Sequence, residues 1–158
     1  MGVLDRLAEL GLELPPAPQP VASYVTAVRT GNLVFTSGQL PLVDGALPAT
    51  GLVGEREGDV SPATAKDLAR TAALNGLAVV DAALRDAGGL DAVVRVVKVT
   101  GFVASAPGFT GQPGVVNGTS DLLVEVLGEA GRHARSAVGV AELPLGSPVE
   151  VELVVEVA

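Results

Sequence analysis

Cysteine is absent from the 158-residue chain, and histidine occurs only once, as His133. These absences exclude a disulfide framework, a cysteine nucleophile, an iron–sulfur cluster and a zinc site built from Cys and His. Serine–histidine–aspartate catalysis would have to run through His133, yet no Ser stands in a G-x-S-x-G frame. The Walker A and G-x-G-x-x-G patterns are also missing. Magnesium held by carboxylates stays open, but no motif supports it.

Basic and aromatic residues are scarce. The chain has 10 Lys and Arg against 18 Asp and Glu, a net charge of −8, and aromatics make up 3% of it. Nucleic-acid binding needs clustered cations to displace phosphate counterions and aromatic rings on which bases stack. We therefore expect no nucleic-acid partner. Hydrophobic residues make up 48% of the chain, which is enough for the core of one compact domain built from Val, Leu and Ala.

Long uninterrupted apolar runs are missing as well. The apolar stretch at the N-terminus carries three charged residues, unlike the apolar region of a secretory signal. The longest apolar stretch, residues 93–104, is interrupted by Arg95 and Lys98 and is too short to span a bilayer. We expect a cytoplasmic protein with no membrane partner.

The spacing of apolar residues, together with glycine, proline and capping residues, predicts an α+β domain with a mixed sheet and helices on one face. An N-terminal segment, residues 1–20, holds a short helix and a proline-rich connector, and residues 21–158 form the single domain. The predicted helices are 3–11, 61–87 and 115–130; the predicted strands are 23–29, 33–37, 93–104, 135–142 and 149–157; residues 41–60 and 105–114 are loops.

Two segments carry the strongest local signals. Ser61 followed by Pro62 is a typical helix start, and Thr30-Gly31-Asn32 between two short strands predicts a hairpin. In the last strand a period of two places Glu150, Glu152 and Glu156 on one face. That acidic face is either solvated or presents one carboxylate to a cleft.

Two separated motifs make the sequence similar to a known family. SYVTAVRTGNLVFTSGQLP, residues 23–41, resembles the opening hairpin of the Rid family, also called the YjgF/YER057c/UK114 family, which includes reactive-intermediate enamine/imine deaminases. ARSAVGVAELPLGSPVEVELVVEVA, residues 134–158, resembles the closing hairpin of the same family. The elements between them follow the family's order, so the resemblance covers residues 21–158.

The resemblance implies a chorismate-mutase-like fold, with two helices on one face of a mixed sheet, that assembles as a homotrimer with clefts between subunits. It implies a hydrolase acting on C–N bonds, which converts small enamine or imine acids to 2-oxo acids and ammonia without a metal or organic cofactor. The residues that match the family's site are, for catalysis, Arg135 and Glu152, and, for binding a small carboxylate substrate, Tyr24, Ser37, Gly38, Asn117, Arg135 and the backbone around Ala137.

The chemistry of these residue types agrees with such a reaction. A guanidinium fork pairs with a substrate carboxylate through two charge-assisted hydrogen bonds, and this contact fixes the substrate's orientation. A carboxylate such as Glu152 can orient a water molecule or transfer its proton when it lies within hydrogen-bond reach.

Each candidate also has a structural explanation. Arg135 at a strand start is suited to an ion pair with an acidic neighbour, and Glu150 and Glu156 offer the chemistry of Glu152 in other registers. The remaining candidates have equally plain alternatives: a half-buried core position for Tyr24, an ordinary turn at Ser37-Gly38, and a surface position near a helix end for His133.

Three features depart from the shorter family members: the N-terminal extension, a longer loop at residues 106–114, and Ala137 where many members have Cys. They alter the rim of the cleft, so the sequence does not name the substrate. A non-catalytic trimer that binds small carboxylates is the alternative. An endoribonuclease is disfavoured by the acidic charge and the lack of a histidine pair.

Overall fold

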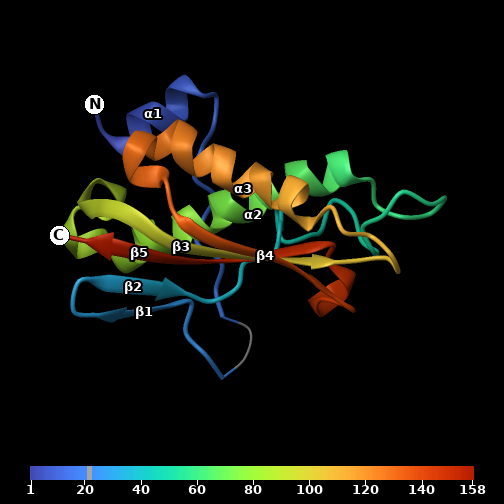
Figure 1. Ribbon diagram of the computed structural model, residues 1–158. Helices are drawn as coiled ribbons and strands as arrows, with labels where there is room; N and C mark the ends of the chain where they lie inside the picture. Colours follow the sequence, from blue (N-terminus) through green and yellow to red (C-terminus); the bar gives the residue numbers. More distant parts are fainter. Residues whose placement is uncertain (21–22) are drawn as a thin grey trace.

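One five-stranded mixed sheet organises the protein. The computed structural model describes residues 1–20 and 23–158, and Figure 1 shows the helices gathered above one face of the sheet. β3 and β4 are parallel, and the other neighbouring strands are antiparallel. The strand order is β1 (Ala27–Thr30), β2 (Leu33–Thr36), β5 (Val149–Val157), β3 (Val93–Ala104) and β4 (Ala134–Val140).

The covered face of the sheet carries the core. Every second residue of β5, from Val149 to Val157, is at most 2% exposed, as expected for the apolar side of the alternating pattern. Helices α2 (Pro62–Ala83) and α3 (Gln112–Leu127) pack on this side. The glutamates of β5 therefore lie on the opposite face, which none of the α-helices in the described part of the chain covers (Figure 1).

The predicted helices exist, with shifted ends. Ser61 is the N-cap of α2, since its Oγ accepts a hydrogen bond from the Thr64 amide at 3.1 Å. The helix ends at Ala83 instead of residue 87, and two short 3₁₀ turns, Arg85–Ala87 and Gly89–Ala92, lead into β3. α3 begins at Gln112, three residues before the predicted start, because Pro113 is accepted in its first turn.

The opening hairpin is confirmed. Thr30 pairs with Leu33, so that Gly31 and Asn32 form the turn, and Gly31 has the positive φ of +58° that such a turn requires. The first strand begins at Ala27, four residues later than predicted. The expected boundary between residues 20 and 21 is next to residues 21–22, which lie outside the described part of the chain.

The expected closing hairpin is wrong. β4 does not pair with β5: β3 lies between them, parallel to β4 on one side and antiparallel to β5 on the other. The segment from β3 through α3 to β4 is thus a parallel crossover, which leaves β4 at the edge. β5, the more apolar strand, lies in the interior of the sheet between β2 and β3.

The N-terminal helix α1 (Val3–Glu9) is docked, but its leucines are only partly buried. Leu7 is 1% exposed within the core, whereas Leu4 is 55% exposed. The Arg6 Nε group donates to the Glu125 carbonyl of α3 at 3.0 Å. In residues 1–20 and 23–158, no helix combines the length and apolar character that a bilayer crossing needs.

Candidate active site

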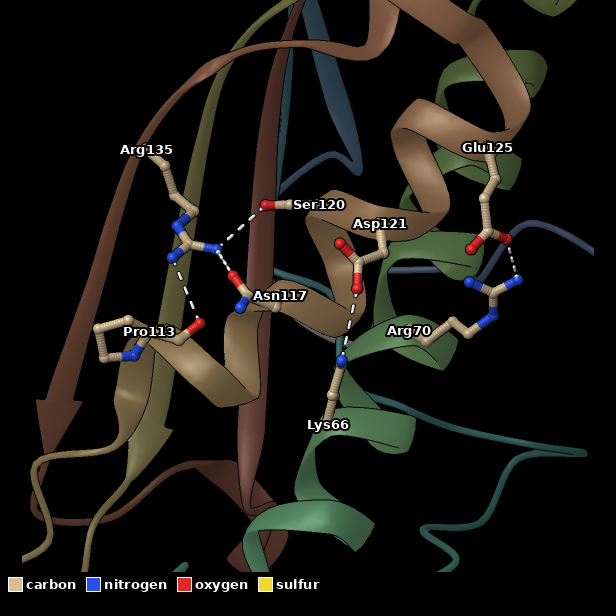
Figure 2. Close-up of polar contacts among 8 residues, drawn as sticks. All are labelled: Lys66, Arg70, Pro113, Asn117, Ser120, Asp121, Glu125 and Arg135. Carbon is tan, nitrogen blue, oxygen red and sulfur yellow. Dashed lines mark hydrogen bonds and ion pairs between the residues drawn. The ribbon is translucent and has the colours of Figure 1, made fainter.

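Arg135 is held against α3 by neutral acceptors. It is the second residue of β4 and pairs with Val99, whose side chain is fully buried on the helix-covered face. Its Nη1 group donates to Asn117 Oδ1 at 2.8 Å and to Ser120 Oγ at 3.2 Å, and Nη2 donates to the Pro113 carbonyl at 3.3 Å (Figure 2). Asn117 and Ser120 share one face of the helix because they are three residues apart.

These contacts leave part of the guanidinium free. Arg135 belongs to none of the ion pairs that residues 1–20 and 23–158 form with one another, and the nearby cations Lys66 and Arg70 pair with acids of α3 instead (Figure 2). An arginine has five N–H groups, and three are used here. Nε–H and one N–H of Nη2 remain, on the edge that lies opposite Nη1. That edge matches the two oxygens of a carboxylate.

His133 and Ser120 extend the Arg135 contact. His133 Nε2 lies 2.9 Å from Ser120 Oγ, and its Nδ1 lies 2.5 Å from the Gly131 carbonyl oxygen. Burial lowers the pKa of His133, and the charge of Arg135 lowers it further, against an opposing effect of the Gly131 hydrogen bond. An open pocket of about 270 Å³ is bounded by these side chains together with Val124 and Arg132.

A second group of predicted residues lies on the uncovered face of the sheet. The carboxylate of Glu150 lies directly against Gly38, since a Cβ added at Gly38 would clash with Glu150 Oε1. Ser37, next to Gly38, donates its hydroxyl to the Val25 carbonyl at 2.7 Å. Glu150 is paired with Phe102 of β3, and Glu152 with Thr100.

Glu150 is therefore the carboxylate of β5 that lies against Gly38. Burial raises the pKa of Glu150, and the negative charge of Glu152 raises it further. The sequence named Glu152 and left Glu150 as an alternative in another register, because a period of two places both on one face. The glycine of the turn is the local signal that distinguishes them, once strand pairing is known.

The structure does not bring all predicted residues together in one chain. Asn117 contacts Arg135, and Ala137 shares the Arg135 face of β4, whereas the glutamates of β5 and Gly38 lie on the opposite face. Tyr24 precedes β1 and is 47% exposed. Sequence reasoning missed Ser120, although its place one helical turn after Asn117 could have indicated it.

Another cavity lies apart from these residues. It has a volume of about 420 Å³ between residues 54–59 and the loop 106–111, and none of the predicted site residues line it. Within residues 1–20 and 23–158, His, Asp and Glu side chains form no group of three suited to hold a metal ion.

Together, the strand order and the Arg135 contacts define an α+β protein with a partly free guanidinium held between β4 and α3. Residues 15–157 match the model of the family described as Endoribonuclease L-PSP. The chain therefore belongs to this family, the Rid or YjgF family whose two sequence motifs it carries.

Two proteins of similar sequence and one similar crystal structure match this chain over most of its length. Protein TCP17 of Trypanosoma cruzi is 45% identical over 155 residues, 98% of this chain and 93% of that one. The 2-iminobutanoate/2-iminopropanoate deaminase of Salmonella typhimurium is 38% identical over 138 residues, 87% of this chain and 90% of that one. The crystal structure of Atu1372, a protein of unknown function from Agrobacterium tumefaciens, is 47% identical with a TM-score of 0.88, covering 99% of this chain and 92% of that one.

Proposed function

We propose that the protein hydrolyses small enamine or imine acids to 2-oxo acids and ammonia. The observation that carries this proposal is the Arg135 guanidinium, which neutral acceptors on α3 hold while its Nε–Nη2 edge stays free. A small α-imino acid carries a carboxylate next to the electrophilic C=N carbon. Binding the carboxylate at Arg135 would fix the position of that carbon and shorten the approach of water.

The reaction needs proton transfer at two points. The oxygen of water adds to the C=N carbon as one of its protons moves to the nitrogen. The hydroxyl proton of this adduct then moves to the nitrogen as well, the C–N bond breaks, the C=O bond forms and ammonia leaves. Glu150 is suited to this transfer because its raised pKa lets it hold a proton closer to neutral pH. We assign it this role in preference to Glu152, whose charge helps to raise that pKa.

The site we propose is shared between copies of the chain. Arg135 and Glu150 lie on opposite faces of one sheet, so they cannot flank the same small molecule within one chain. The uncovered face also exposes Val28 and Phe35, 54% and 42% accessible, which favours association through it. A homotrimer with clefts between subunits would let Arg135 of one copy meet Glu150 of another.

Two alternatives remain distinct from this proposal. A trimer that binds 2-oxo or amino acids without turnover needs Arg135 but not Glu150. An endoribonuclease is the activity for which the family model is named, but the net charge of −8 opposes RNA binding.

The test generates 2-iminobutanoate in the cuvette from 2-aminobutanoate with an amino acid oxidase, and follows the release of ammonia and 2-oxobutanoate. We expect release to be faster with the protein than without it, and faster than with Arg135→Ala. Equal rates in all three mixtures would reject a deaminase. Binding of 2-oxobutanoate without turnover would then support the non-catalytic binder, and cleavage of a labelled RNA would support the endoribonuclease.

A further inference from the structure

The only histidine of the chain ends a directed chain of hydrogen bonds that starts at Arg135. The Gly131 carbonyl can only accept, so His133 carries its proton on Nδ1 and leaves Nε2 as an acceptor. The Ser120 hydroxyl must then donate to Nε2, and its oxygen accepts from Arg135 Nη1. Each hydrogen atom in this chain has one acceptor, and the directions agree throughout.

We propose that His133 is a positioning residue for Arg135 and acts through the Ser120 hydroxyl. The proposal rests on the proposed function insofar as Arg135 binds the substrate carboxylate. A serine within a helix can turn its hydroxyl to the carbonyl four residues earlier, here that of Val116. The acceptor on His133 draws the Ser120 proton away from that alternative and turns an oxygen lone pair toward Arg135.

The surroundings of His133 favour its neutral form. Arg132 and Arg135 line the same pocket, Glu129 pairs with Arg132 at 3.0 Å, and α3 contributes the uncharged Ser120 and Val124. A proton on Nε2 would reverse the hydrogen bond to Ser120 and add a third positive charge. A carboxylate bound at Arg135 offsets that charge. Carboxylate binding should therefore raise the pKa of His133.

The first experiment observes the guanidinium itself. The ¹⁵N-labelled protein gives an Arg135 Nε–H signal, assigned by its loss in Arg135→Gln, and its heteronuclear NOE reports the order of the group. His133→Leu removes the acceptor, whereas His133→Gln places an amide oxygen near the site of Nε2 and cannot titrate. Arg70, paired with Glu125, is the internal reference.

We expect His133→Leu to lower the order of Arg135, and His133→Gln to retain it, with Arg70 unchanged in both. The affinity for 2-oxobutanoate, measured by calorimetry, should fall roughly two- to tenfold in His133→Leu, the range that one ordinary hydrogen bond gives. His133→Gln should stay within about twofold of the parent. In deamination, His133→Leu should raise KM more than it lowers kcat, because Arg135 binds the carboxylate of the substrate and not the carbon that reacts.

The outcomes separate the two proposals. Unchanged order of Arg135 in His133→Leu overturns the positioning role, whatever the activity. Lowered order in His133→Leu, together with a parent that neither binds 2-oxobutanoate nor hydrolyses the imine, keeps the positioning role and rejects the proposed function. In the parent, the Cε1–H signal of this single histidine should also show a higher pKa when 2-oxobutanoate is bound, and an unchanged pKa contradicts the coupling to Arg135.

Discussion

At the scale of single residues, we expect the shape of the Arg135 side chain to matter more for deamination than its charge. Arg135→Lys keeps the charge but loses the planar fork, so we expect it to impair deamination nearly as much as Arg135→Ala. Loss of a charge-assisted hydrogen bond should slow turnover roughly ten- to more than a hundredfold. Turnover is measured by ammonia release, alongside a thermal melt of each variant.

The fold should survive both Arg135 substitutions, since the hydrogen bonds of the guanidinium go to polar groups of α3 and not to the apolar core. A lysine variant that turns over like the parent would reject the two-oxygen anchor. Unfolding of both variants would instead make Arg135 a structural residue.

Replacing Glu150 by Gln should affect activity and the pH dependence of stability more than replacing Glu152. Glu150→Gln should lower activity by about a hundredfold or more, as expected for loss of a general acid–base group, and Glu152→Gln by less. The folded-state pKa of Glu150 is raised, so its contribution to stability is present at low pH and is lost as the pH rises through that pKa. The melting temperature of Glu150→Gln minus that of the parent should therefore be larger at about pH 8 than at about pH 5.

Stability is measured by thermal melts of the parent and both glutamine variants at the two pH values. Activity is measured by ammonia release. Equal losses of activity in the two variants would show that the Gly38 contact does not distinguish the glutamates. A stability difference that does not change with pH would contradict the burial of the Glu150 charge.

At the scale of elements, local patterns predicted which segments form strands and helices, but not how the strands pair. β3 and β5 have the predicted bounds, because their valine-rich alternation is a strong local signal. The β4–β5 hairpin was wrong because strand pairing is a long-range property, and two strands joined by a short link can still flank a third. β4, with Ala, Ser and Gly, has too few apolar side chains for the interior of a sheet, which is the signal that favoured the edge.

The contact between α2 and α3 depends on a glycine. A Cβ at Gly118 would clash with the Lys66 carbonyl of α2 and crowd the Arg70 amide nitrogen, neither of which can move freely. We expect Gly118→Ala to destabilise the protein by about 1–3 kcal/mol, as overpacking does. Gly114→Ala, in the same helix with open space around it, should stabilise by about 0.5–1 kcal/mol.

Urea unfolding of both glycine variants at neutral pH measures the two free energies of unfolding. If the free energy of unfolding of Gly118→Ala falls by no more than that of Gly114→Ala changes, the two helices can move apart at Gly118 without cost.

The short helix α1 is stable only because Leu7 is buried. An isolated helix of seven residues is marginal in water, whereas this one places Leu7 in the core and bonds to α3. Hydrogen exchange should show protected amides from Arg6 to Leu12. Leu7→Ala should speed that exchange markedly, and Leu4→Ala, at an exposed position, should not.

Rapid exchange of these amides in the parent would show that the helix is not docked. The alignments with TCP17 and Atu1372 cover 98% and 99% of this chain, whereas the alignment with the Salmonella typhimurium deaminase covers 87% of it. The aligned part of TCP17 and Atu1372 therefore includes the sequence of α1.

At the scale of the whole molecule, the sheet leaves its acidic and apolar face without a helix, and the two halves of the proposed site lie on opposite faces. Both observations favour closed association of identical copies. We expect light scattering at micromolar concentration to give three times the chain mass of 15.8 kDa. A monomer mass would reject the shared cleft, since Arg135 could then never meet Glu150.

A charge placed on the uncovered face should break assembly and activity together. Phe35 is 42% exposed and pairs with Val28 and Val154 on that face, so Phe35→Asp should lower the mass toward one chain and abolish imine hydrolysis. Leu145→Asp introduces the same charge at a 75% exposed residue outside the sheet, and its positive φ of +59° tolerates Asp. That control should keep both mass and activity. A monomeric Phe35→Asp that still hydrolyses the imine would place the complete site within one chain, and Glu150 would then have no part in the reaction at Arg135.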